Sequence, residues 1–353
     1  MTKQNSTFPE MDANDVCKLL ETYAAEEKKL LFLCHVNPDG DTVGSAFALK
    51  KIYALLGGTA CCACTSDVPE YLRFLLRQDS ILYTPDMEKD FDCIWTVDVA
   101  SPAQLGRLSG LAEQTVLSID HHGSCTLFAP HYLDPNASAT GELIYSIYAN
   151  FLQQGKISEN ADVCRLIYAA ISADTGSFQY SNTTPQTMQI AASLLETIQK
   201  DPEGPDATSI AHRLHGCHTM GELKAQKLVI ERLQLACRDR LAYVCIPASL
   251  PEENRLSDFD FGGMVDIPRS VSGVLVGLAI KESKTEEGTY KVSARSNCDI
   301  DVAAILSKFG GGGHTRAAGA TIIADSCSDV VEKVVWAFTL EIQAYLKEKK
   351  KYL

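Results

Sequence analysis

The sequence predicts an α/β protein whose first half is a parallel sheet with helices on both faces, followed by a smaller α/β domain. Short apolar runs alternate with amphipathic stretches in the first half, and strands that alternate with helices imply parallel pairing. The composition is that of a folded chain, because 46% of the 353 residues are hydrophobic and 22% are charged. At about 150 residues per domain, this length predicts two domains.

The elements of the first half follow from the positions of apolar residues. Residues 29–36 (KLLFLCHV) are typical of a buried strand, and residues 42–56 carry apolar side chains at helical spacing. Gly57 and Gly58 then stop the helix. Further strands are expected at 59–65, 91–97 and 115–119, and helices at 141–152 and 161–171.

The alternation breaks at residues 200–207 (KDPEGPDA), where prolines, a glycine and acidic residues are typical of a linker. We therefore expect a first domain over 1–199, a linker over 200–218 and a second domain over 219–353. In the second domain, helices are expected at 219–235, 303–308 and 329–345, and strands at 240–246, 273–280 and 290–294.

Charge and targeting signals limit the possible partners. The 32 Lys and Arg against 45 Asp and Glu leave a net charge of −13. This charge excludes a strongly basic protein that coats nucleic acid. It does not exclude a short nucleotide that is bound in a pocket together with metal ions. The polar N-terminus lacks a secretory signal and no apolar run is long enough to span a membrane, so we expect a cytoplasmic protein. Its 13 cysteines are then expected to be reduced, and Cys61, Cys62 and Cys64 lack the CxxC spacing of a metal or redox site.

Histidine and aspartate follow the first predicted strand. His35, Asp39 and Asp41 lie within seven residues, where Pro38 and Gly40 force an irregular turn before the helix. Ligands of open α/β sheets bind at the carboxyl ends of strands. A metal site is therefore the favoured interpretation, and a helix N-cap at Asp41 is the structural alternative.

The same residue types end three further segments. Asp98 ends one predicted strand, Asp120, His121 and His122 follow another, and Asp174 follows an apolar helical run. Each alone is compatible with a cap or a turn, but together they indicate one metal centre. Mixed carboxylate and imidazole ligation suits Mn²⁺, with Mg²⁺ or Co²⁺ also possible, and the absence of cysteine argues against structural zinc.

These segments resemble a known superfamily. HVNPDGD (35–41), VDVA (97–100), DHHGS (120–124) and ADTGSF (173–178) resemble the successive motifs of the DHH phosphoesterases. VSARSN (292–297) and FGGGGHTRAAGA (309–320) resemble the DHH-associated C-terminal domain, so the likeness spans residues 29 to 322. Size and motifs are most similar to the stand-alone bifunctional oligoribonucleases (nanoRNases), which also remove phosphate from pAp, adenosine 3′,5′-bisphosphate.

The resemblance implies a centre for two divalent ions. The implied ligands are His35 and Asp39 for one ion, Asp41, His121 and Asp174 for the other, and Asp98 as the bridge. A water shared by two such ions loses its proton near neutral pH and attacks phosphorus in line. Asp98, Asp120 and His122 are the expected catalytic residues, with His122 at the scissile phosphate or leaving oxygen and Asp120 in a supporting position.

The glycine run of the second domain is the other predicted centre. Four glycines allow backbone amides to turn toward one point, as in an anion nest, although a hinge or helix stop is the structural alternative. The residues expected to bind substrate are Arg295, Ser296, Gly311, Gly312, Gly313 and His314. By resemblance they hold the nucleotide end remote from the cut. Many members carry a basic-then-Asn stretch after GGGGH; here it is Thr315-Arg316-Ala317, so the role of Arg316 is open, as is that of Arg269.

The resemblance implies Mn²⁺-dependent hydrolysis of short RNA oligonucleotides to mononucleotides, together with removal of the 3′-phosphate of pAp. Hydrolysis of cyclic or linear dinucleotides (c-di-AMP, pApA) is the alternative in the same class. A pyrophosphatase is disfavoured by the GGGGH domain, and a non-catalytic nucleotide sensor is disfavoured because all six implied ligands and His122 are present. A homodimer is compatible with the sequence, and no membrane partner is expected.

Overall fold

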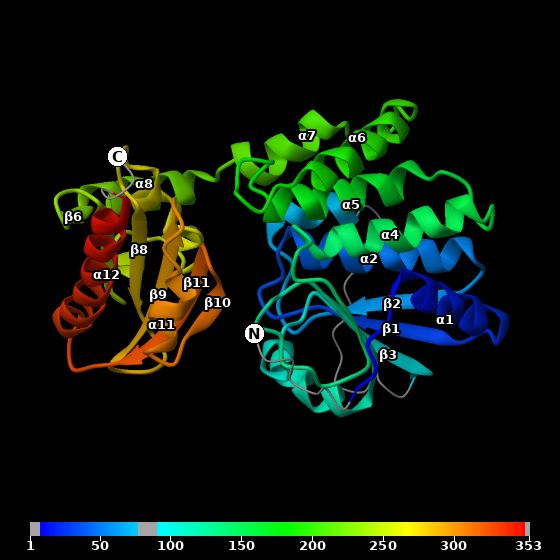
Figure 1. Cartoon of the computed structure of the whole chain (residues 1–353), viewed down its shortest axis with the longest axis horizontal. Coiled ribbons are helices and arrows are strands. Elements are labelled where there is room, and N and C mark those ends of the chain that lie inside the picture. The colour runs from blue at the N-terminus through cyan, green and yellow to red at the C-terminus, as the bar shows by residue number, and fades with distance from the viewer. Residues whose placement is uncertain (1–7, 77–89, 350–353) are drawn as a thin grey trace. The chain divides into compact units, whose positions relative to one another are not determined.

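The computed structural model describes residues 8–76 and 90–349. These residues form two compact units, Met1–Cys217 and His218–Leu353, each with its own core. Within the described ranges, no helix combines the length and the apolarity that crossing a bilayer requires. Each unit is described by itself below (Figure 1).

The first unit contains a five-stranded sheet in the order β2-β1-β3-β4-β5, and all of its pairings are parallel. This confirms the predicted parallel α/β sheet. The strands are β1 (Lys29–Leu33), β2 (Thr59–Ala63), β3 (Cys93–Val97), β4 (Thr115–Asp120) and β5 (His131–Leu133).

Helices cover this sheet unequally on its two faces. One face packs on a large core shared with α1 (Ala13–Ala25), α2 (Gly40–Leu55), α4 (Thr140–Gln153), α5 (Ala161–Asp174) and α6 (Pro185–Gln199). The other face, with Leu31 and Leu33, packs on the 3₁₀-helical segment Pro102–Gln114 through Leu105 and Leu111. Figure 1 shows α2, α4 and α5 stacked together above β1, β2 and β3.

Close helix packing depends on three glycines. A Cβ atom added at Gly44 of α2 would lie 2.5 Å from the carbonyl oxygen of Leu166 in α5, and one at Gly40 would lie 2.6 Å from the Cβ of Ala173. A Cβ at Gly141 of α4 would lie 2.8 Å from that of Ala170. The starts of α2 and α4 can therefore approach the end of α5, where the aspartates of the sequence motifs lie.

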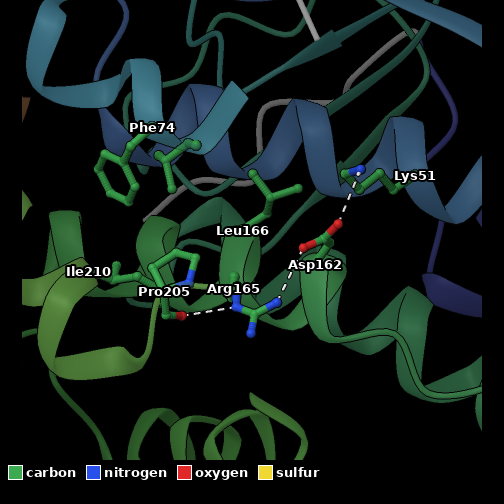
Figure 2. A pocket seen from close by; sticks show the side chains of 8 residues that line it. Lys51, Phe74, Asp162, Arg165, Leu166, Pro205 and Ile210 are labelled. Carbon is green, nitrogen blue, oxygen red and sulfur yellow. Dashed lines mark hydrogen bonds and ion pairs between the residues drawn. The ribbon is translucent and has the colours of Figure 1, made fainter. Parts of the chain in front are cut away.

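The segment expected as a linker is largely folded onto the first unit. It contains α7 (Ala207–Ala211) and a π-helical turn, His212–Gly216, and Ile210 is fully buried. The buried Arg165 of α5 donates to the carbonyl oxygen of Pro205 at 2.9 Å and to the carboxylate of Asp201 at 2.7 Å. Figure 2 shows this arginine beside a small pocket. The pocket is lined by Lys51, Phe74, Leu75, Asp162, Arg165, Leu166, Pro205 and Ile210.

The second unit contains a six-stranded mixed sheet in the order β10-β11-β9-β8-β7-β6, in which only β7 and β8 are parallel. The strands are β6 (Gln234–Ala236), β7 (Leu241–Ile246), β8 (Val276–Glu282), β9 (Thr289–Ser296), β10 (Gly312–His314) and β11 (Ala317–Ile323). The helices are α8 (Met220–Glu231), α9 (Leu250–Glu253), α10 (Asp266–Ser270), α11 (Val302–Ser307) and α12 (Cys327–Lys349).

The two faces of this second sheet are covered differently. Residues Val292 and Ala294 of β9 face a core built with α11 and α12. The opposite face is covered at β7 and β8 by α8 and the segment around Phe261 and Met264. On β9 and β11 that opposite face carries residues that are half-buried or exposed, alternating with buried ones. This part of the sheet is called the open face below.

Candidate metal centre

The candidate metal centre lies at the edge where adjacent parallel strands end. His35 follows β1, Asp98 follows β3, and Asp120 is the last residue of β4. Since β1, β3 and β4 are neighbours in the sheet, their carboxyl ends meet there. The start of α2 adds Asp39 and Asp41.

The first group of ligand atoms comes from His35, Asp39 and Asp98. The Nε2 atom of His35 lies 3.6 Å from Oδ1 of Asp39 and 3.5 Å from Oδ2 of Asp98. Its other ring nitrogen, Nδ1, lies 2.9 Å from the carbonyl oxygen of Val36, which orients the ring. Asp98 has a φ of +61°, a left-handed conformation that aspartate tolerates better than most residues and that is often found at functional sites.

The second group comes from Asp41, His121 and Asp174. The Nε2 atom of His121 lies 3.2 Å from Oδ2 of Asp174 and 3.7 Å from Oδ2 of Asp41. The same nitrogen lies 3.8 Å from Oδ1 of Asp98. Asp98 therefore presents one carboxylate oxygen to each group, Oδ2 to His35 and Oδ1 to His121.

His122 is held by Asp120 beside these groups. Oδ1 of Asp120 lies 2.7 Å from Nδ1 of His122 and accepts the backbone amide of His121 at 2.8 Å. This contact turns Nε2 of His122 away from Asp120, and the His122 side chain is 23% exposed. The structure thus places the Asp120 carboxylate against Nδ1 of His122.

Asp41 is held by the start of α4. Its carboxylate accepts the backbone amides of Thr140 at 2.7 Å and Gly141 at 3.0 Å, and the hydroxyl of Ser45 at 2.9 Å. The N-cap of α2 is Asp39, whose Oδ1 accepts the amide of Thr42 at 3.1 Å, so the alternative of an N-cap at Asp41 is wrong. The physical reason is that Asp41 already lies in the first turn of α2 and points at a different helix.

Thr140 is a site residue that sequence reasoning missed. Its hydroxyl donates to Oδ1 of Asp98 at 2.9 Å while its amide donates to Asp41, so it contacts both groups of ligand atoms. Thr140 is fully buried at the first position of α4. It does not cap α4, whose N-cap is Ala139, so capping rules give no sequence signal for it.

The electrostatics of the site call for positive charge. In the described part of the chain, the ion-pair partners of the carboxylates at this site are histidines: the carboxylates are those of Asp39, Asp41, Asp98, Asp120 and Asp174. Burial opposes charge on His35, but its hydrogen bonds with Asp39 and Asp98 outweigh burial and raise its pKa to about 12. Burial and the charge of Asp98 raise the pKa of Asp41 well above its usual range. Protons are thus drawn to a site with more carboxylates than cations.

The donor set fits divalent cations. The two groups each offer three oxygen or nitrogen atoms that lie within 4.8 Å of one another. The buried Oδ2 of Asp120 has no hydrogen-bond partner among the residues that the structure describes. Carboxylate and imidazole ligands without cysteine suit Mn²⁺, Mg²⁺ or similar ions.

In the second unit, strand pairing aligns two basic residues, His314 and Arg295. His314 pairs with Ala317, Ala317 with Arg295, and Arg295 with Gly277, so these four lie in one row across β10, β11, β9 and β8. Paired residues share a face of a sheet. A Cβ atom at Gly277 would lie 2.5 Å from the backbone nitrogen of Arg269, which places α10 over the end of this row.

The structure does not bring Ser296 to this row. Ser296 follows Arg295 on β9, so its side chain points to the opposite face, where it is 5% exposed. Its hydroxyl donates to the carbonyl oxygen of Cys298 at 3.0 Å. Arg316 lies in the turn after β10 and pairs with Asp299 at 2.8 Å.

The glycine run is needed for close strand pairing. A Cβ atom at Gly311 would lie 2.3 Å from the carbonyl oxygen of Gly319, and one at Gly313 would lie 2.5 Å from that of Ala317. The amide of Gly311 already donates to Leu306, and that of Gly310 to Ser307. Two of the four amides of the predicted anion nest are therefore used within the unit, whereas Gly312 is exposed beside open space.

Comparison with known proteins matches each of the two units to a family of domains. Residues 29–171 match the DHH family N-terminal domain, and residues 242–340 match the DHHA1 domain. The chain belongs to the DHH family. As a DHH protein with a DHHA1 domain, it is a phosphoester hydrolase.

Relatives of this DHH protein include the bifunctional oligoribonuclease and PAP phosphatase NrnA of Thermus thermophilus, 29% identical over 91% of this chain and 93% of that protein. The cyclic-di-AMP phosphodiesterase GdpP of Geobacillus thermodenitrificans is 26% identical over 88% of this chain and 47% of that protein. An exopolyphosphatase-related protein from Bacteroides fragilis has the same fold, with a TM-score of 0.77 at 21% identity over 93% of this chain and 96% of that chain.

Proposed function

We propose that this DHH protein uses two divalent ions, Mn²⁺ in preference, to hydrolyse very short RNA oligonucleotides to mononucleotides and to remove the 3′-phosphate of pAp. The observation that carries the proposal is Asp98, which presents one oxygen to each of two histidine–aspartate groups. The likeness to NrnA of Thermus thermophilus over nearly the whole of both chains supports this choice of substrates.

The ligands follow from the two groups of atoms. His35 and Asp39 would hold one ion, Asp41, His121 and Asp174 would hold the other, and Asp98 would offer one oxygen to each. Bound there, a pair of divalent ions supplies Lewis acidity toward the phosphoryl oxygens and makes a bound water more acidic. Thr140 and the amide of Gly141 hold the carboxylates of Asp98 and Asp41 in place, so that little reorganisation is needed when substrate binds.

His122 supplies the proton of the reaction. Asp120 fixes the ring through Nδ1 at 2.7 Å, and the ring is the partly exposed member of the histidine pair. The proton held at Nε2 passes to the leaving oxygen, which would otherwise depart as an alkoxide. Asp120 remains ionised and stabilises the charged ring.

Arg295 and His314 hold the phosphate or nucleotide end remote from the cut, with Arg269 beside them. The small Ala317 lies between His314 and Arg295 in the row and leaves room for a phosphate group. The planar guanidinium of Arg295 suits bidentate binding of phosphate. The exposed Gly312 allows close approach of a ligand to the backbone.

A cyclic or linear dinucleotide phosphodiesterase is the second candidate. It is favoured by the likeness to GdpP, which covers most of this chain but under half of that protein. A non-catalytic sensor is disfavoured, because such a protein has no need of the complete set of ligands and the Asp120–His122 pair.

A hydrolysis panel with purified protein and Mn²⁺ tests the proposal. The substrates are RNA of two to five residues, pAp, pApA, c-di-AMP and pyrophosphate, each with and without a chelator. Fastest turnover of short RNA together with pAp is the expected result, and preference for c-di-AMP would select the second candidate. If no substrate is hydrolysed in a chelator-sensitive manner, the metal assignment fails.

A further inference from the structure

The open face of the second unit extends beyond the Arg295 row. Strand pairing places Thr321 opposite Lys291, and Lys291 opposite Lys281, in a second row of the same face. Lys291 and Arg295 are four positions apart on β9, so their Cα atoms are about 13 Å apart. The face therefore carries basic side chains at two levels along one strand.

Only small residues lie between these two levels. Gly312 pairs with Gly319, Gly319 with Ser293, and Ser293 with Ala279. Gly319 is exposed and Ser293 is half-buried. The sheet surface between Arg295 and Lys291 therefore has no bulky side chains. A ligand can lie against the strands along this surface.

Three lysines, Lys281, Lys284 and Lys291, influence one another at this end of the sheet, although the chain as a whole carries −13. Lys281 and Lys284 share one carboxylate, that of Asp258, at 3.6 and 3.5 Å. Lys291 is exposed and has no ion-pair partner among the described residues. Burial, together with the charges of Lys291 and Lys284, lowers the pKa of Lys281 despite Asp258, so an anion bound here would relieve repulsion.

We propose that β9 carries a phosphate track, from Arg295 past Ser293 to Lys291, that binds the backbone of an RNA oligonucleotide beyond the terminal nucleotide. The inference rests on the proposed function and deepens it, because it predicts that substrates longer than a dinucleotide gain affinity from Lys291. Single-stranded nucleic acid is the occupant that fits, since exposed β-sheet faces with basic side chains accommodate unpaired strands.

The test is the length dependence of hydrolysis in Lys291→Gln. The control is Lys333→Gln, which makes the same charge change on an exposed position of α12. We expect the ratio of kcat/KM for a five-residue RNA to that for a dinucleotide to fall about fivefold in K291Q, as for loss of one exposed charged contact, and not to change in K333Q. The dependence of log KM on log salt for the five-residue RNA should weaken by about 0.7.

An unchanged length ratio in K291Q, or an equal change in K333Q, would overturn the phosphate track. Fluorescence anisotropy of a labelled five-residue RNA, measured with chelator, tests binding without catalysis. If wild type hydrolyses no RNA, the proposed function fails, yet weaker binding by K291Q than by K333Q would still support the track. Equal binding by wild type, K291Q and K333Q would refute it.

A separate observation concerns two thiols on the other side of the second sheet. The Sγ atoms of Cys245 in β7 and Cys327 lie 2.8 Å apart, and both residues are half-buried. Cys327 is the first residue of the 23-residue helix α12, whose amide end favours a thiolate. The hydrogen bond between the two thiols also lowers the pKa of Cys327, although burial opposes this.

From this pairing we infer that Cys245 and Cys327 form a reversible disulfide when a peroxide is present. The Cys327 thiolate attacks a peroxide oxygen and the O–O bond breaks. Hydroxide departs, and Cys327 becomes a sulfenic acid. The Cys245 thiol then attacks that sulfur, the S–O bond breaks, and water leaves as the disulfide forms. Two electrons pass from the thiols to hydrogen peroxide, and a dithiol reductant reverses the change.

Mass spectrometry of the intact chain, treated with hydrogen peroxide and then alkylated, tests this inference. Wild type should lose two hydrogen masses and two alkylation sites, and peptide mapping should place the bridge between Cys245 and Cys327. The change should be absent in Cys327→Ser and Cys245→Ser but present in Cys298→Ser, which removes another half-buried thiol. A first bridge between other cysteines, or its persistence in C245S, would refute the pairing.

Discussion

The hydroxyl of Thr140 provides the sharpest test of the metal centre, because one substitution removes one hydrogen bond to the carboxylate that joins the two groups. Thr140→Val has nearly the same shape and is fully buried in the same place. It deletes the 2.9 Å bond to Oδ1 of Asp98 but leaves the backbone amide bonded to Asp41. The perturbation thus acts on the position of Asp98 and on little else.

The expected magnitude follows from the charge of the acceptor. A hydrogen bond to an ionised group contributes about 1.5–3 kcal/mol, which corresponds to roughly 10- to 150-fold in an equilibrium or a rate. Substitutions behind metal ligands typically weaken metal affinity or activity by about 10- to 100-fold. We therefore expect T140V to lose about 10- to 100-fold in Mn²⁺ affinity or in kcat.

The assay combines calorimetric Mn²⁺ binding with turnover of pAp over a range of Mn²⁺ concentrations. Thr140→Ser keeps the hydroxyl and should stay close to wild type, while circular dichroism verifies that both variants are folded. A folded T140V with wild-type metal affinity and wild-type kcat would refute the argument that this hydroxyl positions Asp98.

The remaining predictions concern the bridge, the second unit, helix packing and pH. Asp98→Ala should abolish turnover in a folded protein; substantial Mn²⁺-supported activity would contradict the bridging role. Arg295→Ala should raise KM while the metal content measured by elemental analysis stays that of wild type, and loss of metal would contradict a substrate role. Gly44→Ala should destabilise the chain by about 1–3 kcal/mol in urea unfolding, because its Cβ would lie 2.5 Å from a carbonyl oxygen of α5; an unchanged midpoint would argue against close packing of α2 on α5. Folding raises the pKa of His35 to about 12, so protonation of His35 stabilises the metal-free fold. This stabilisation is complete below pH 6.5 and declines as the pH rises toward 12. In chelator, the urea midpoint should therefore fall less steeply between pH 7 and 9 in His35→Gln than in wild type.

The sequence is most informative where structure depends on neighbouring residues. The apolar run before His35 and the capping aspartate before α2 are local signals, so the parallel sheet and its strand ends are predictable. The site residues of different strands then meet, because parallel neighbours share their carboxyl edge. Other local signals are present but weaker, such as Thr184 and Pro185 at the start of α6, an element that strand–helix alternation does not predict.

Features that depend on contacts between residues far apart in the chain cannot be predicted from such local signals. The proline- and glycine-rich segment after residue 199 has the composition of a linker, yet hydrogen bonds from Arg165 to Asp201 and Pro205 hold it on α5. Ser296 is adjacent to Arg295 in sequence, but the pleat of β9 turns it to the opposite face. A motif therefore does not specify which of its side chains face a ligand until the register is known.

By itself, the sequence determined the α/β class and the segments that supply the histidines and aspartates at the strand ends, because periodicity, capping and strand ends are local properties of the chain. Only the tertiary structure decided that Asp98 presents an oxygen to each group, that Thr140 holds it there, and that Arg295 and Lys291 share an open face. These relations depend on helix packing and strand register, which arise from contacts between residues far apart in the chain.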